Sequence, residues 1–76
     1  MSISQDPTAR WDVLFSCVAV AVERALKEST VINATHEAHA ILDKCQIPRD
    51  EASVKAVVDH IAVLAAAKGV PIQLGD

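Results

Sequence analysis

The sequence predicts an all-α fold, a three-helix domain in which two long helices flank a short one. Apolar residues recur every three or four positions within three segments, about residues 7–29, 34–45 and 49–68, as expected of amphipathic helices. Helix-breaking or helix-capping residues separate these segments. At 76 residues the chain is too short to divide, so residues 1–76 are expected to form a single small helical domain.

The first helix is expected to begin at Pro7, because Asp6 is a good N-cap and proline suits the first helical position. It is expected to end near Ser29, where Ser29 and Thr30 offer a break. Its predicted apolar face consists of Trp11, Leu14, Phe15, Val18, Val22, Ala25 and Leu26.

The second helix is expected to open at Asn33, whose side chain can accept a hydrogen bond from a free N–H group of the first turn. Glu37 then lies near the positive end of the helix dipole. The helix must stop before Pro48, since the residue ahead of a proline favours extended conformations. Its predicted apolar side consists of Val31, Ala34, Ala38, Ile41, Leu42 and Cys45.

The third helix is expected to start either with Pro48 at its first position or with Asp50 as its N-cap. Lys68 and Gly69 predict its end, because a cation suits the last turn and glycine suits the position after it. The predicted buried stripe consists of Val54, Val57, Val58, Ile61, Leu64 and Ala65. Residues 70–76 then form an extended tail, which packs on its own domain or, alternatively, docks on a partner.

Composition and charge narrow the class of protein. The formal net charge is −3, with 7 basic residues scattered singly among 10 acidic ones, so no electrostatic footprint for nucleic acid is expected. The longest apolar stretch is far shorter than the roughly 20 residues of a membrane helix. With 2 cysteines and no signal-peptide pattern, we expect a cytoplasmic protein without a disulfide framework.

The histidines of the second helix are weak candidates for a metal site. His36, His39 and Asp43 share one face of the helix, at spacings of three and four residues. A zinc site needs three or four ligands with supporting partners, whereas ligands on one exposed face leave the rest of the coordination to water. We therefore expect the solvated side of an ordinary helix, with no bound metal and no cofactor; weak metal binding is the third alternative.

No pattern in the sequence predicts catalysis. A nucleophilic site needs a nucleophile in contact with a base, and donors for the developing oxyanion. No motif supplies this arrangement around Cys17 or Cys45, and Gly69 and Gly75 do not form a phosphate-binding loop. We expect no catalytic residues and no enzymatic activity. Cys45 is expected to be a small core residue.

A DNA-binding regulator is the main alternative, because two helices joined by a few residues resemble a helix-turn-helix. In that motif the N-terminal end of the second helix enters the major groove. Here that end has two negative charges, Asp50 and Glu51, and one positive charge, Arg49, so it would repel the phosphates of DNA. Gln46 stands where the turn would favour glycine.

Two helices have a second apolar stripe that a lone domain does not need. Alanines there are explained by helix propensity, but exposed valines are poor helix formers and indicate a contact surface. The predicted interface consists of Val13, Cys17 and Val20 on the first helix and Ala52, Ala56, Val63 and Ala67 on the third. We expect a homodimer in which these helices complete a four-helix bundle, and Val20→Glu is expected to disrupt it.

The sequence therefore predicts a small, soluble, non-enzymatic protein–protein interaction module. Its partner is a second copy of the chain, another protein, or both. Such a module acts as a regulator, adaptor or inhibitor through its helical surfaces.

Overall fold

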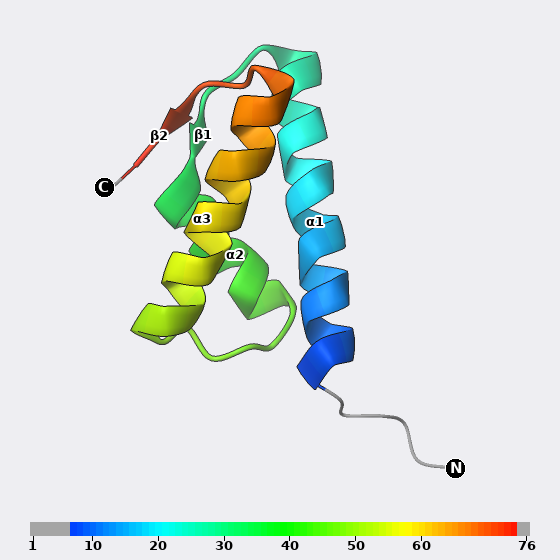
Figure 1. Cartoon of the computed structure of the whole chain (residues 1–76), viewed down its shortest axis with the longest axis vertical. Helices are drawn as coiled ribbons and strands as arrows, with labels where there is room; N and C mark the ends of the chain where they lie inside the picture. Colours follow the sequence, from blue (N-terminus) through cyan, green and yellow to red (C-terminus); the bar gives the residue numbers. More distant parts are fainter. Residues whose placement is uncertain (1–6, 75–76) are drawn as a thin grey trace.

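The computed structural model describes residues 7–74, and it describes side chains from residue 10 onward. These residues form three helices and two short strands: α1 (Pro7–Glu28), β1 (Ile32–Asn33), α2 (Ala34–Lys44), α3 (Glu51–Lys68) and β2 (Ile72–Gln73). In Figure 1, α1 and α3 run side by side and α2 packs behind them. The three-helix fold is confirmed, with a two-stranded sheet that the all-α prediction omitted. The predicted N-cap Asp6 lies outside the described residues.

The N-termini of α2 and α3 are capped by side chains. The Oδ1 atom of Asn33 accepts a hydrogen bond from the His36 N–H at 3.0 Å. The Oδ1 atom of Asp50 accepts one from the Ser53 N–H at 2.8 Å. Asp50 has extended backbone angles, so α3 starts at Glu51, two residues later than the predicted segment 49–68.

The cap of α3 makes stability depend on pH. The backbone and then the side-chain hydrogen bond from Ser53 lower the pKa of Asp50 from 3.8. The folded state thus favours the carboxylate form of Asp50. The contribution of this carboxylate to the stability of the fold is present above about pH 3.8 and is lost as the pH falls through the pKa of Asp50 in the folded state.

Asp50→Asn keeps the hydrogen-bond acceptor but does not titrate. We expect the unfolding free energies of Asp50→Asn and the parent to differ more at about pH 6 than at about pH 3 in chemical denaturation. A difference that is the same at both pH values would contradict this role of the carboxylate.

All three helices end in the same way, with one residue in the left-handed conformation. Ser29, Gln46 and Gly69 have φ values of 57°, 59° and 75°. In each case the next residue donates its N–H to the carbonyl five positions earlier, which is the Schellman motif. These bonds join Thr30 to Ala25 (3.0 Å), Ile47 to Leu42 (2.9 Å) and Val70 to Ala65 (2.8 Å). Of these three left-handed residues, only Gly69 is the glycine that usually occupies this position.

The core lies where the three helices meet. Its buried members are Leu14, Val18, Val22, Ala25, Ile32, Ala34, Ala38, Ile41, Leu42, Ile47, Val57, Ile61, Ala65 and Val70. Three residues of the predicted apolar faces are exposed instead. Phe15 and Leu26 lie on the edge of the α1 stripe, where α3 covers them only partly, and Val31 precedes α2 instead of belonging to it.

The C-terminal tail packs on its own domain. β2 pairs in parallel with β1, with Ile32 opposite Ile72 and Asn33 opposite Gln73. The Ile32 N–H also donates a hydrogen bond to the Pro71 carbonyl at 3.1 Å. The tail therefore joins the segment between α1 and α2 to the end of α3, as Figure 1 shows.

Candidate interaction surfaces

A largely apolar surface runs along the side on which α1 and α3 meet. We call it the α1–α3 face. It consists of Trp11, Phe15 and Leu26 on α1 and of Ala52, Ala56, His60, Val63 and Ala67 on α3. Phe15 joins the two helices, since its ring centroid lies 4.5 Å from that of His60 and 5.8 Å from that of Trp11.

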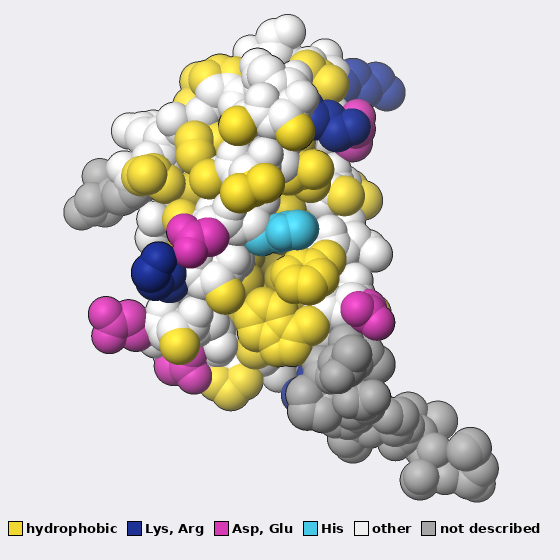
Figure 2. Space-filling model, viewed as in Figure 1, with side chains coloured by type: hydrophobic (Ala, Val, Ile, Leu, Met, Phe, Trp, Pro, Cys, Tyr) yellow, Lys and Arg dark blue, Asp and Glu magenta, His cyan; other side chains and the backbone are white. Residues whose placement is uncertain are grey.

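The spacing of the α3 residues explains why they share this side. Ala56 lies four residues before His60, Val63 lies three residues after it, and Ala67 lies seven residues after it. Residues at these spacings fall on one side of a helix. On α1, Leu26 lies three turns beyond Phe15. Figure 2 shows hydrophobic side chains gathered along this side, with a histidine among them.

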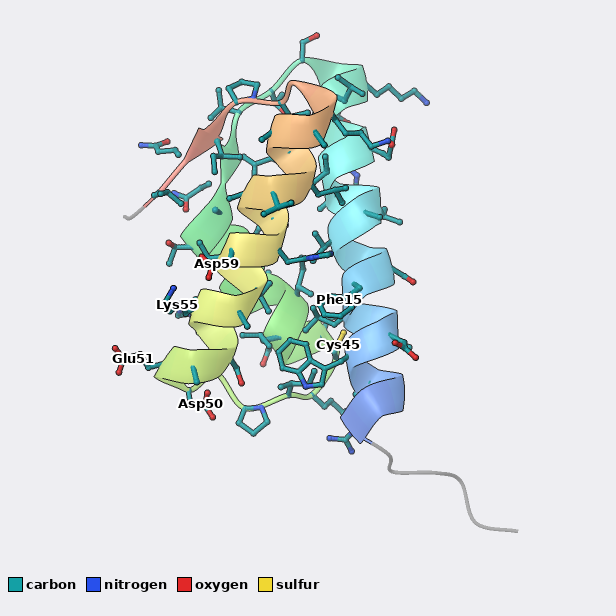
Figure 3. All side chains as sticks on the ribbon, in the orientation of Figure 1. Phe15, Cys45, Asp50, Glu51, Lys55 and Asp59 are labelled. Atoms are coloured by element: carbon teal, nitrogen blue, oxygen red, sulfur yellow. The ribbon has the colours of Figure 1, made fainter. Side chains whose placement is uncertain are left out.

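Charged side chains lie at one border of the α1–α3 face and between its two helices. Lys55 and Asp59 form an ion pair at 3.1 Å on the side of α3 that points away from α1 (Figure 3). Lys68 pairs with Glu23 between the C-terminal halves of α3 and α1. The α1–α3 face is therefore apolar with one ion pair at its border and a second ion pair that bridges the C-terminal halves of its two helices.

A second surface is the α1–α2 groove, a shallow depression of about 220 Å³. Its lining from α1 is Val13, Ser16, Cys17, Val20, Ala21 and Arg24, and its lining from α2 is Glu37, Ile41 and Lys44. At about 100° per residue, Val13 and Val20 point about 140–160° away from Phe15 around α1. The seven residues predicted to form one interface therefore lie on two surfaces, with the α1 members in the groove and the α3 members on the α1–α3 face.

Phe15, Leu26 and His60 belong to this surface although the sequence did not predict them there. Helical periodicity places Phe15 and Leu26 on the apolar face of α1, whereas the structure leaves both of them exposed. A signal was present in α3, where His60 interrupts a stripe of small residues at helical spacing. A polar ring in the middle of an apolar stripe indicates a face that is not fully buried.

The polar side of α2 lines an open groove of about 630 Å³. His36, His39 and Asp43 do share this groove, together with Asn33, Thr35, Ala40 and Arg49. The guanidinium of Arg49 is a positive charge in the lining and disfavours a cation. Among the side chains that the structure describes, no group of three or more His, Cys, Asp or Glu residues is placed to hold a metal ion.

The N-terminal end of α3 is acidic and exposed. Asp50 caps the helix and Glu51 occupies its first turn, and both lie at the same end of α3 in Figure 3. A recognition helix presents this end to the phosphates of DNA. The geometry thus gives the DNA-binding alternative no support.

Comparison with protein-family models, with curated proteins and with solved structures found no match for this chain. Within residues 7–74, none of the helices combines the length and the hydropathy needed to cross a bilayer. The surfaces themselves are therefore the basis on which a function is proposed.

Proposed function

We propose that this chain is a small, non-enzymatic protein–protein interaction module that forms a homodimer through its α1–α3 face and acts in the cytoplasm as a regulator, adaptor or inhibitor. The supporting observation is the exposure of large apolar side chains on that face. Phe15 is 40% exposed, Leu26 45% and Val63 70%. Contiguous exposed apolar surface with a polar border is typical of interaction sites.

The sequence of α3 suits pairing with a second copy in the antiparallel direction. With a two-fold axis near His60, Ala52 would face Ala67 of the second copy, and Ala56 would face Val63. Small residues at such positions let two helices approach closely. The same arrangement brings the acidic start of each α3, at Glu51, toward the basic end of the other, at Lys68.

The size of the face is close to what a stable dimer needs. The two helices have 22 and 18 residues, which gives lengths of about 33 and 27 Å. With axes about 8–10 Å apart and each helix about 10 Å wide, the side that the two helices present is about 18–20 Å across and covers on the order of 600 Å². Standard interfaces bury about 800 Å² on each partner, and flanking side chains would supply the remainder.

Val63→Glu tests this proposal. We expect the variant to raise the dimer dissociation constant by roughly 100-fold or more, because each unpaired buried charge costs several kcal/mol and about 1.4 kcal/mol changes Kd tenfold. Helix content should be unchanged, since Val63 is 70% exposed in the single chain. Sedimentation equilibrium gives the dissociation constant, and circular dichroism gives the helix content.

Val20→Glu is the matched control, since it makes the same substitution at a valine that is 57% exposed in the α1–α2 groove. From the structure we expect it to remain a dimer, which replaces the expectation drawn from the sequence. A parent chain that is monomeric well above micromolar concentration would refute the homodimer. If Val20→Glu is a monomer while Val63→Glu remains a dimer, the dimer interface is the α1–α2 groove and not the α1–α3 face.

A further inference from the structure

Cys17 lies on the side of α1 that faces α2, and Cys45 is the C-cap residue that directly follows α2. Cys17 lines the α1–α2 groove opposite Ile41 and Lys44. Cys45 directly follows Lys44 and lies one turn beyond Ile41, whose carbonyl accepts its N–H at 3.0 Å. Both side chains are half-buried against the same core, and both are free thiols. Figure 3 places Cys45 at the end of α2, next to α1.

We propose that Cys17 and Cys45 form a redox modification site, in which a peroxide converts the two thiols into one disulfide that joins α1 to α2. The site is independent of the α1–α3 face, because Cys17 lies in the groove and not on that face. Its substrate is hydrogen peroxide or a small organic hydroperoxide, small enough to reach a shallow groove.

The environment of the thiols indicates their order of reaction. Burial, followed by the neighbouring Cys17 and a hydrogen bond with it, raises the pKa of Cys45 from 9.0, and the charge of Lys44 opposes this only in part. The Cys45 thiolate is therefore scarce near neutral pH, and thiolate is the reactive form. Cys17, which lines the groove, is the thiol that meets the peroxide first.

The chemistry balances in two steps. The Cys17 thiolate attacks one peroxide oxygen, so that an S–O bond forms and the O–O bond breaks. The departing oxygen leaves as hydroxide from hydrogen peroxide or as an alkoxide from an organic hydroperoxide, and it takes up a proton to become water or an alcohol. Cys45 then loses its thiol proton and attacks the Cys17 sulfur, so that the S–S bond forms and the S–O bond breaks, and the oxygen departs with a proton as water. Two thiols are oxidised and one peroxide is reduced.

The disulfide would fix the end of the α1–α2 pair that is otherwise unlinked. Residues 29–33 connect the two helices at one end, and Cys45 lies at the other end of α2 (Figure 1). α1 and α2 contact each other less than either contacts α3. Closing this end restricts the unfolded chain, so we expect the melting temperature to rise on the order of 10 °C.

The test treats the reduced full-length chain with a slight molar excess of hydrogen peroxide and then alkylates the remaining thiols. We expect an intact mass lower by two hydrogen atoms, with no alkylation. Trypsin cuts after Arg10, Arg24, Lys44 and Arg49, so the product should contain residues 11–24 joined to residues 45–49. The rise in melting temperature should disappear when dithiothreitol is added.

Single-cysteine variants provide the controls. Cys45→Ser should retain a sulfenic acid at Cys17, which dimedone traps, while Cys17→Ser should react more slowly at Cys45. The chain in denaturant should form the disulfide more slowly than the folded chain does. The proposal is overturned if the folded chain keeps both thiols alkylatable, if its products are disulfides between two chains, or if denaturant does not slow the reaction. None of these results depends on whether the α1–α3 face forms a dimer.

Discussion

We expect Leu14→Ala to lower the free energy of unfolding by roughly 2–5 kcal/mol, which is the usual cost of replacing a buried leucine with alanine. Leu14 is 0% exposed and is among the largest fully buried side chains of the core. Its loss leaves a cavity between α1 and the helices packed on it. For a chain of this size such a loss is a large part of the total stability.

Leu26→Ala makes the same substitution on the same helix at a side chain that is largely outside the core. We expect it to cost less than half as much, because fewer buried contacts are lost. Both variants are best compared by urea denaturation in the Val63→Glu background, so that association does not contribute to either value. Equal losses at the two positions would contradict the packing described for α1.

Deletion of residues 70–76 is expected to be the second most destabilising change. Val70 is 5% exposed, and fully burying such a side chain contributes about 1.5–3 kcal/mol. The deletion also removes β2 and the hydrogen bond that closes the end of α3. We expect a lower melting temperature with the helical circular dichroism signal retained below it.

A shorter deletion, of residues 74–76, is the control for the tail. It keeps Val70 and the pairing of β1 with β2, and among the described residues it removes only Leu74, which is 63% exposed. We expect this variant to melt close to the full-length chain. If the deletion of residues 70–76 melts at the same temperature too, the tail does not stabilise the domain and its pairing with β1 has another purpose.

The helices could be predicted because their local signals agree with their packing. Asn33, Asp50 and Gly69 each occupy the cap position that their chemistry favours. The left-handed angles of Ser29 and Gln46 have no such local signal, since neither residue is a glycine. In those cases the hydrogen bonds of the Schellman motif, and the burial of Ile47 after Gln46, outweigh the local cost.

The surfaces could be predicted only in part, because helical periodicity gives angles around each helix but not the position of its neighbours. Helical periodicity places both Val20 and Val63 outside the core stripes. Which neighbour each one faces depends on how α1 packs against α2 and α3, and this is a tertiary property. β1 could not be predicted for a similar reason, since a two-residue strand forms only through its pairing with the distant β2.

A dilution series followed by amide and indole chemical shifts is the most direct test of the α1–α3 face as the dimer surface. As the concentration falls through the dissociation constant, we expect the largest changes at Phe15, Ala56 and Val63 and at the indole N–H of Trp11, with little change at Val13 and Val20. Changes concentrated at Val13 and Val20, or spectra that stay constant while the chain remains monomeric at millimolar concentration, would contradict the account.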